Sequence, residues 1–440
     1  MPSRELLRKD LAELFASRAY WLLLLAAGLL AGQAFITAVN AYAEASGIGG
    51  GAAALSQGLS PLDGILVPTA SAYDLAITLL FPFVAIRLIA SEKSSGALKL
   101  LLQWPVTMGQ QLAAKVVTLL IAWLLALLPF AIALVLWCAY GGHLDTRETL
   151  NLLAGYTLRF LLTSSLALAA AAMMPGAANA AVVVLGFTIG TWALDFVAAG
   201  RGGWLQRLAS FTPTATLRTF ERGLFRVDVA LILILLALFF VVLTGIALDL
   251  GRTTRARITR SAIAAAIIAI AIVGAAQIRT SFDVSENRRN SFAPADEATL
   301  AQIRDPLTIT VFMAAEDPRM FDFENNVLVK LRRAVPRLEE RYPFAGRSGL
   351  FDNDDRYGEV HYTLRGKTAV SRSTTEEIVL ETIDGLAGLR VPAHAAPTYP
   401  GYPLAKRPRF AAVAFYVAWP LLTFAAWLTS RRAPRSRRTG

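Results

Sequence analysis

The sequence predicts an α-helical polytopic membrane protein that carries a small extracytoplasmic α/β domain near its C-terminus. Of its residues, 55% are hydrophobic and 17% are charged, whereas soluble domains average about 45–50% apolar and about 25% charged residues. The apolar residues gather in long runs, and a charged, proline-containing stretch, Arg279–Arg409, separates the last two runs. That composition and length are typical of a small domain that folds in water.

Apolar runs long enough to cross a bilayer, which takes about 20 residues in a helix, occur eight times. The first run is longer than the apolar core of a secretory signal, so we expect an uncleaved anchor. In chain order the predicted spans are Ala19–Asn40, Ala72–Ala90, Ala114–Ala139, Leu152–Met174, Asn179–Ala199, Val229–Leu250, Ser261–Ile278 and Phe410–Thr429.

The distribution of Lys and Arg predicts the orientation. Basic residues precede the first span, follow the second, fill the loop after the sixth and dominate the C-terminal tail. The positive-inside rule places these regions in the cytoplasm, so we expect a multi-pass protein of the inner (plasma) membrane with both termini cytoplasmic. The arginine-rich loop Gly200–Asp228 disagrees, because it falls outside. Either its arginines lie on amphipathic helices at the outer headgroups, or a span is miscounted.

These boundaries divide the chain into five parts. The apolar side chains Leu7, Leu11 and Leu14 share one face of the first segment, which predicts an amphipathic elbow helix lying on the inner leaflet. The parts are the elbow helix 1–18, a six-helix membrane domain 19–250, a cytoplasmic loop and seventh span 251–278, the extracytoplasmic α/β domain 279–409, and the eighth span with its basic tail 410–440.

The α/β assignment of 279–409 rests on periodicity. Leu307–Phe312 alternates like a strand, and Gly358–Leu364 suggests another. Helical spacing of apolar residues predicts helices over Asn326–Tyr342 and Thr375–Leu386.

The sequence offers no site for cofactor chemistry. It lacks the G-x-x-x-x-G-K-[ST] loop that cradles ATP phosphates, so any ATP and magnesium would bind in a partner chain. The three histidines are isolated, and the single cysteine, Cys138, lies in an apolar run. The basic residues, which could suggest nucleic acid, cluster beside apolar runs, so a lipid bilayer explains them better. We therefore expect no metal and no nucleic acid.

The segment Ser91–Val106 stands out at the cytoplasmic end of the second span. It turns at Gly96, forms a short apolar helix and stops before Pro105. A short helix that projects from the membrane suits a soluble partner, but a plain loop with its leucines among the lipid headgroups has the same spacing.

This segment resembles the E-x-K-x-x-G-x-L-x-x-L-L-x-x-P-V pattern of type 2 ABC exporter permeases, although Lys99 stands where an acidic residue is usual. The resemblance implies a permease fold, a homodimer or pseudodimer of permease chains, and a separate ABC ATPase subunit that binds here. The coupling residues it implies are Glu92, Lys93, Gly96, Leu98, Leu101, Leu102, Pro105 and Lys115.

Two further segments resemble one permease subfamily, which includes the gliding-motility permeases and the permeases of nitrous-oxide-reductase copper maturation. The first, Phe211–Asp228, looks like their outer-loop element. The second, Phe282–Pro294 with the strand that follows, resembles the start of the gliding-type auxiliary subunit, so the chain looks like a permease fused to a shortened auxiliary domain. The outer-loop positions that match are Pro213, Phe220, Gly223 and Asp228.

Two charges lie at membrane depth, Arg159 in the fourth predicted span and Asp195 in the fifth. Charged side chains at membrane depth are candidates for a functional role. They could pair with each other toward the outer leaflet, or each could reach the nearby interface.

We therefore expect the membrane-spanning subunit of an ABC transporter, an exporter by resemblance, which is not itself an enzyme. The alternative is a non-transporting scaffold that presents an extracytoplasmic binding domain. A third reading, a membrane enzyme, would use carboxylates of one glycine-containing turn that are better explained as solvated side chains. Those carboxylates are Asp352, Asp354, Asp355 and Glu359.

Overall fold

The computed structural model divides into two compact units, each described by itself. The membrane unit comprises Met1–Ile189, Arg226–Thr280 and Pro400–Gly440, and the α/β unit comprises Gly190–Phe225 and Ser281–Tyr399. The structure describes residues 2–46, 59–101, 106–198, 205, 208–249, 251–278, 280–314, 317–344, 355–389, 399, 401–402 and 410–432.

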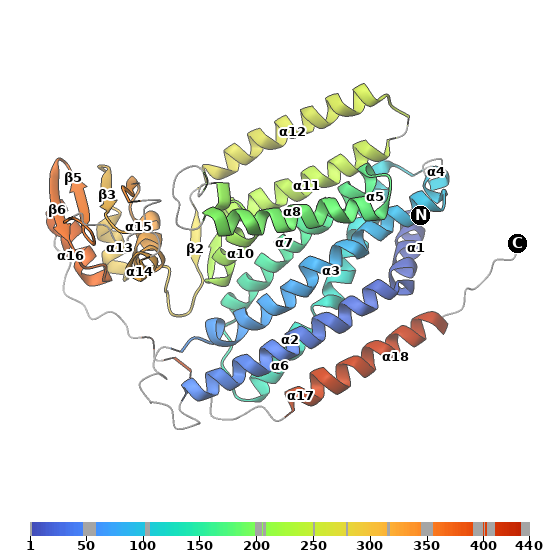
Figure 1. Ribbon diagram of the computed structural model, residues 1–440, viewed down its shortest axis with the longest axis horizontal. Helices are drawn as coiled ribbons and strands as arrows, with labels where there is room; N and C mark the ends of the chain where they lie inside the picture. Colours follow the sequence, from blue (N-terminus) through green and yellow to red (C-terminus); the bar gives the residue numbers. More distant parts are fainter. Residues whose placement is uncertain are drawn as a thin grey trace, which may run out of the picture. The chain divides into compact units, whose positions relative to one another are not determined.

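All eight predicted spans are confirmed as helices that are long and apolar enough to cross a membrane (Figure 1). Three of them contain breaks: the second begins with a π-turn, the third is interrupted where α5 gives way to α6 at Leu127, and the eighth has a π-turn between α17 and α18. In chain order the spans are α2 (Arg18–Ala45), η2 and α3 (Leu62–Leu66, Val67–Ser94), α5 and α6 (Met108–Ala126, Leu128–Ala139), α7 (Thr146–Met173), α8 (Ala177–Ala198), α11 (Val227–Leu248), α12 (Thr254–Ala276), and α17, η5 and α18 (Ala411–Val413, Ala414–Ala418, Trp419–Arg432).

The centre of the membrane unit is the packing of α3 between α2 and α7, with α11 on the other side of α7. Aromatic rings fill it: Trp123 of α5 stacks on Phe160 of α7 at 4.6 Å, and Phe81 of α3 meets the same ring edge-on at 4.8 Å. Such ring pairs add stability beyond the burial of their area.

The predicted elbow helix is α1 (Pro2–Ala16), which is separated from α2 by Ser17 alone. Its side chains Leu6, Asp10 and Leu14 are buried, at helical spacing, against the rest of the membrane unit. One face of α1 is therefore packed on protein, including a charged residue that lipid alone would not accept.

The α/β unit is built on a four-stranded mixed sheet with the order β4-β3-β5-β6. β3 pairs in parallel with β4 and antiparallel with β5, and β5 and β6 form an antiparallel hairpin. The strands are β3 (Leu307–Val311), β4 (Leu338–Arg341), β5 (Val360–Leu364) and β6 (Lys367–Ser371).

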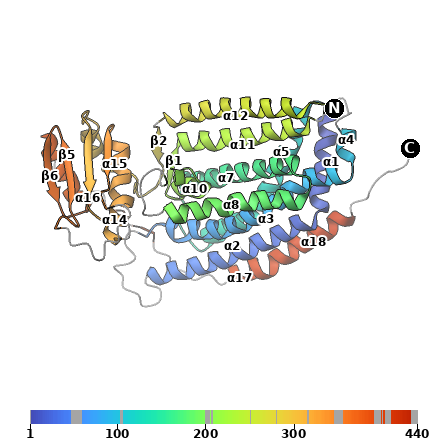
Figure 2. The same cartoon turned by 45° about the horizontal axis from the view of Figure 1, so that its top comes forward.

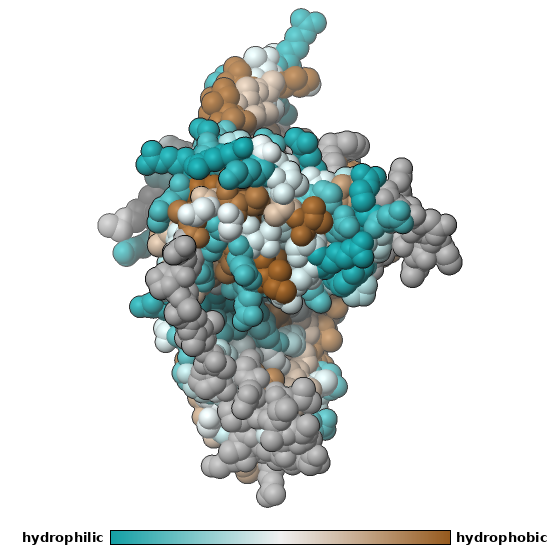
Figure 3. All heavy atoms as spheres, turned by 90° about the vertical axis from the view of Figure 1, so that its left-hand side faces the viewer, coloured by the Kyte–Doolittle hydropathy of each residue, from teal (hydrophilic) through white to brown (hydrophobic). Residues whose placement is uncertain are grey.

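Alternate residues of β3 and β5 point to one face of this sheet, where the helices lie. Ile309 and Tyr362, which are opposite each other in the register, are both fully buried there. The core also takes buried side chains from α13 (Pro294–Leu300), α14 (Pro318–Phe323), η3 (Glu324–Leu328), α15 (Val329–Ala334) and α16 (Glu376–Ala387). Figure 3 shows hydrophilic side chains spread among smaller hydrophobic areas on this unit.

One helix prediction in the α/β unit is wrong in its second half. The strands expected at Leu307–Phe312 and Gly358–Leu364, and the helix expected at Thr375–Leu386, are present. The helix expected over Asn326–Tyr342 ends at Ala334, and Leu338–Arg341 is strand β4. The cause is Pro336, because a proline disfavours helical backbone at the residue before it, and Val335 is extended with ψ 119°.

Replacing Asp384 of α16 by Asn should stabilise the α/β unit at neutral pH. Burial, together with the nearby Asp296, raises the pKa of Asp384 to about 6. The folded state therefore prefers the protonated acid, and the stability it contributes is complete below the ordinary pKa of 3.8 and lost as the pH rises through 6. Because the side chain is partly exposed, we expect Asp384→Asn to gain about 1 kcal/mol or less at pH 7.5.

The check is urea-dependent proteolysis of the full-length variant at pH 7.5 and near pH 4, where the gain should disappear. Asp322→Asn, an exposed carboxylate of α14, is the matched control and should show no such pH dependence. An equal gain at both pH values would contradict the assignment.

Candidate functional site

A cluster of buried charges lies at one end of the membrane unit, where α1, α3 and α5 meet. Glu92, in the last turn of α3, accepts a hydrogen bond from Lys9 of α1 and lies 2.9 Å from the ammonium of Lys115 of α5. Asp10 of α1 lies 3.7 Å from the same Lys115 nitrogen. The carboxylate side chains of Glu92 and Asp10 are each 3% exposed. Three helices are thus held together by two buried carboxylates and the buried Lys115, with the partly exposed Lys9 at the edge of the cluster.

The pairing is what makes this burial tolerable, since an unpaired buried carboxylate costs several kcal/mol. Burial raises the pKa of Asp10, and the neighbouring Lys115 and Lys9 act against that rise. Burial lowers the pKa of Lys9, but its hydrogen bond to Glu92 and the attraction of Glu92, Asp10 and Glu13 together raise the pKa overall. The oxygens of Asp10, Glu13 and Glu92 lie within 4.8 Å of one another, as metal ligands do. Lys9 and Lys115 already pair with Glu92 and Asp10, and Ser91 donates a hydrogen bond to Glu13, so we assign no metal to the set.

The neighbouring Lys93 binds the C-terminal end of α7. Its ammonium donates hydrogen bonds to three carbonyls at the C-terminus of α7, those of Ala171, Ala172 and Met174, at 3.0, 2.9 and 2.7 Å. These carbonyls have few partners within the helix, and a cation there is also favoured by the helix dipole. Glu92 and Lys93 together therefore fix the end of α3 to α1, α5 and α7.

The short helix α4 (Ala97–Leu101) follows immediately, at a sharp turn. Gly96 makes this turn with φ +74°, a conformation that favours glycine. Within α4, Leu98 is buried whereas Leu100 is 65% exposed. Leu101 belongs to α4, while the predicted coupling residues Leu102 and Pro105 lie outside the described residues. The exposed Leu100 of α4 therefore projects beside the end of α3 that Glu92 and Lys93 hold in place.

The structure brings most of the predicted coupling residues into contacts within the membrane unit. Glu92 pairs with Lys115, Lys93 donates to the end of α7, and Leu98 is buried. The high cost of an unpaired buried charge favours this pairing within the chain, and the role of these residues in coupling stays a prediction. Of the expected residues in the described part of the chain, Gly96 is exposed, and Leu100 was not anticipated.

The charges inside the spans also differ from expectation. Arg159 of α7 does not pair with Asp195; its guanidinium lies 3.3 Å from the carboxylate of Asp74 in α3, which also accepts a hydrogen bond from Thr78 at 3.2 Å. Asp195 instead accepts a hydrogen bond from Thr212 at 2.5 Å. Asp74 lies within a predicted span, so a search for acidic residues there would have found the partner of Arg159.

The outer-loop element forms helix α10 (Pro213–Glu221) and strand β1 (Leu224–Arg226). Pro213 and Phe220 are buried, and Gly223, at φ +74°, turns the chain between helix and strand. A side chain at Gly223 would lie 2.8 Å from the Cβ of Ser285, which is too close. Asp228, in the first turn of α11, pairs with Arg226 at 2.6 Å. β1 pairs with β2 (Ser281–Asp283), so this loop meets the start of the α/β domain.

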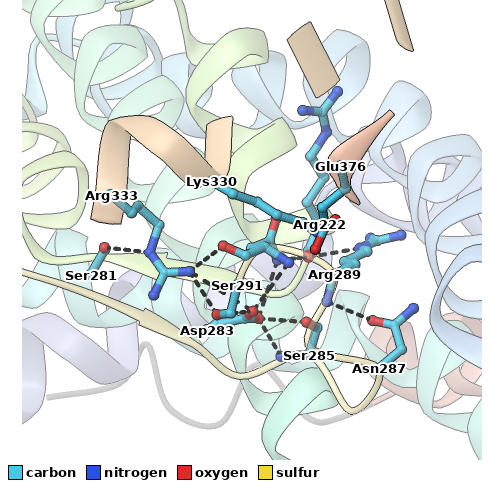
Figure 4. Close-up of polar contacts among 11 residues, drawn as sticks. Arg222, Ser281, Asp283, Ser285, Asn287, Arg289, Ser291, Lys330, Arg333 and Glu376 are labelled. Atoms are coloured by element: carbon cyan, nitrogen blue, oxygen red, sulfur yellow. Dashed lines mark hydrogen bonds and ion pairs between the residues drawn. The ribbon is translucent and has the colours of Figure 1, made fainter. Parts of the chain in front are cut away.

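Asp283 is the centre of that meeting (Figure 4). Its carboxylate accepts hydrogen bonds from the hydroxyls of Ser285 and Ser291, at 2.5 and 2.6 Å, and from the amide side chain of Asn290 at 3.2 Å. Arg333 of α15 donates to the hydroxyl of Ser291 at 2.9 Å. The Asp283 side chain is 5% exposed, and these donors replace the water it gives up.

The same segment holds the end of α10. Asn290 and Arg289 both donate to the carbonyl of Arg222, at 2.7 and 3.0 Å, and Arg289 also donates to the carbonyl of Glu221 at 3.2 Å. Donors of this kind satisfy the free carbonyls at a helix C-terminus. The residues that resemble the start of an auxiliary subunit therefore bind one another and the end of α10. We call this set of contacts the Asp283 joint.

The carboxylates of the third reading are only partly described. Glu359 accepts a hydrogen bond from Arg372 at 3.1 Å and contacts the ring of His361 at 3.0 Å, and these two groups lower its pKa. Asp352 and Asp354 lie outside the described residues. Glu359 is thus part of a surface ion-pair network.

Comparison with known families concerns the first part of the chain. The family model for ABC-2 family transporter proteins matches residues 4–220. The matched segment is similar to the proteins of that family. It contains α1, the first five spans, α4 and α10, so the charge cluster and the Asp74–Arg159 pair both lie within it. The match supports a membrane permease of an ABC transporter, a class that works with an ABC ATPase.

Neither the curated proteins nor the solved structures contain a significant match to the chain. Spans six to eight and the folded part of the α/β unit beyond α10 lie outside the ABC-2 match.

Replacing Glu92 by Gln should destabilise the membrane unit by on the order of 3 kcal/mol, because it removes the carboxylate that Lys9 and Lys115 share. The measurement is the fraction of monodisperse protein after heating in mild detergent. Glu44→Gln, an exposed carboxylate in the last turn of α2, is the control and should behave as wild type. Equal behaviour of the two variants would contradict the role of the cluster.

The Asp74–Arg159 pair should show coupling in a double-mutant cycle. Asp74→Asn and Arg159→Met each leave one buried charge without its partner, so the double variant should be more stable than the sum of the two effects by about 1–3 kcal/mol. Thermal stability in detergent measures this coupling. Additive effects would mean that the two side chains do not stabilise each other.

Proposed function

We propose that the protein is the permease subunit of an ABC exporter and that a separate ABC ATPase subunit docks on α4. The observation that supports this most directly is the geometry of α4. It is a short helix with an exposed leucine, set on a base of buried charges, inside the ABC-2 segment. Such a projection gives a soluble partner an apolar contact, and its fixed base lets a force on α4 reach several spans.

The proposed coupling uses the locked end of α3. ATP and magnesium bind in the partner ATPase, and its closure displaces α4. Because Glu92 joins α3 to α1 and α5, and Lys93 joins α3 to α7, the displacement moves four helices together. The turn at Gly96 lies between the partner contact and this base. The membrane part then alternates between two arrangements.

The proposed orientation follows from the docking partner. The α4 end faces the cytoplasm, where ATP is available, so both chain termini are cytoplasmic and the α/β unit is outside the inner (plasma) membrane. The basic residues of the C-terminal tail favour the same orientation. We further propose a homodimer or pseudodimer of permease chains, as in other two-ATPase transporters.

We also propose membership of the subfamily of gliding-motility and copper-maturation permeases, with the α/β unit as a shortened auxiliary domain. The Asp283 joint supports this, because it brings together the two segments that carry the resemblance. The transported substrate is not identified by any of these residues.

The test is affinity purification of the tagged protein from its native membranes in mild detergent, followed by identification of bound chains and an ATPase assay. Leu100→Asp introduces a charge on the exposed part of α4 and should lower ATPase recovery at least about tenfold, which corresponds to a loss of about 1.4 kcal/mol in binding. Leu100 is chosen because it is exposed, whereas a change at the buried residues Glu92 or Leu98 would also disturb folding.

The matched control is Val370→Asp, an equally drastic change at an exposed residue of β6 in the α/β unit. It should leave ATPase recovery unchanged. If wild type brings down an ATPase and Leu100→Asp does so equally well, α4 is not the docking element. If wild type brings down no ATPase at all, the permease proposal fails, and the non-transporting scaffold becomes the better reading.

A further inference from the structure

The last span packs along the first span. Figures 1 and 2 both show α17 and α18 beside α2, and contacts join α2 to η5 and α18. This span lies outside the ABC-2 match, which ends at residue 220. The rest of the membrane unit therefore gains a helix that the matched segment does not include.

The contact is built on two glycines of α2, one turn apart. A side chain at Gly28 would lie 2.0 Å from the indole nitrogen of Trp419, and one at Gly32 would lie 2.3 Å from the Cβ of Phe415. Two small residues four apart let a second helix approach closely within a membrane. Trp419 and Phe415 are themselves four residues apart, so this aromatic pair matches the glycine pair. Both positions of α2 are filled.

A hydrogen bond fixes the depth of this insertion. The indole nitrogen of Trp419 donates to the carbonyl of Leu24 at 2.9 Å, and both groups are buried. Phe415 is fully buried and lies 6.1 Å from the ring of Phe35, also on α2. In lipid, where the hydrophobic effect does not drive helices together, such packing and hydrogen bonds supply the association energy.

Contacts hold both ends of the span. At its start, Ala411 is buried in the hydrophobic cluster that contains Tyr42 of α2. Before the span, Tyr42 donates to the carbonyl of Tyr402 at 2.7 Å, and the ring of Tyr402 stacks on His143 at 3.7 Å. At the other end of the span, Ser430 donates to the carbonyl of Phe15, in the last turn of α1, at 3.2 Å. The span thus contacts α2 around Tyr42 at its start and α1 at its end.

A second glycine pair of the same spacing provides a contrast. Gly186 and Gly190 of α8 have no atom within 4 Å of the position where a Cβ would lie. Of the described side chains of α12, the span that precedes the α/β domain, only Ala275 is buried. Neither α8 nor α12 is packed in a glycine groove as the eighth span is. Two glycines four residues apart are therefore not enough by themselves to bind a second helix.

We propose that the last span is a built-in membrane subunit: the glycine groove of α2 is a receptor for a transmembrane helix, and Phe415 and Trp419 are the side chains that bind it. The span holds its place by this groove rather than by its covalent link to the α/β domain. It connects α1, at one end of the membrane unit, to the end of α2 around Tyr42 at the other.

The test uses the full-length chain with a protease site inserted between Ala395 and Ala396 and a different tag at each terminus. The purified protein is cleaved in mild detergent and washed on the N-terminal tag, and the retained C-terminal fragment is measured. We expect most of the fragment to stay bound in the wild-type background. Gly28→Leu should lower its retention at least about tenfold, a loss of about 1.4 kcal/mol.

Two further variants make the result specific. Gly186→Leu, the matched glycine with open space around it, should retain the fragment as wild type does. Adding Trp419→Ala to Gly28→Leu removes the ring that the leucine would strike but also the hydrogen bond to Leu24, so it should raise retention above that of Gly28→Leu and below that of wild type, which a merely misfolded Gly28→Leu protein would not show. Release of the fragment from wild type, or equal effects of Gly28→Leu and Gly186→Leu, would overturn the proposal. No ATPase is needed in this assay, so its outcome is independent of the proposed docking on α4.

Discussion

The arrangement of the membrane unit depends on the carboxylate of Glu92. A buried charge must be paired, and the two ammoniums that pair with Glu92 come from α1 and α5, far away in the sequence. Satisfying this one group therefore fixes the relative positions of three helices, and the adjacent Lys93 adds α7. The same pairing limits what this end of the unit can offer a partner, because Glu92 and Lys115 are paired within the chain, whereas Leu100 of α4 is exposed.

Contacts between distant parts of the membrane unit join several spans at each of its ends. At one end, Lys93, in the last turn of α3, joins the second span to the end of the fourth, and Ser430 of α18 joins the eighth span to Phe15 of α1. At the other end, Tyr42 of α2 and His143, which follows α6, both contact Tyr402, which precedes the eighth span. In the α/β unit, β1 and β2 pair the end of the loop after the fifth span with the start of the α/β domain. The side of the membrane on which the arginine-rich loop lies stays a prediction.

Hydropathy and alternation predicted the spans and the strands β3 and β5, because the burial of apolar surface acts on each segment separately. The partner of a buried charge depends on how neighbouring helices are rotated, and no single segment encodes that. Arg159 was recognised from its depth in the membrane, but its pairing with Asp74 rather than Asp195 required the packing of α7 on α3. Likewise the sequence showed Asp283 only as one position of a resemblance. Its role became visible when the fold brought together its donors Ser285, Asn290 and Ser291.

The two glycine pairs show where sequence reasoning stops in a membrane. Gly28 with Gly32 and Gly186 with Gly190 have the same spacing, yet the first pair is filled by aromatic rings and the second is open within the chain. In lipid, close approach of backbones is an effective way to attach one helix to another, and glycine only permits it. The decisive information lies in the complementary helix, with large side chains at the matching interval. A glycine groove whose partner is supplied by the same chain can hold an added span without any change to the charge cluster around Glu92.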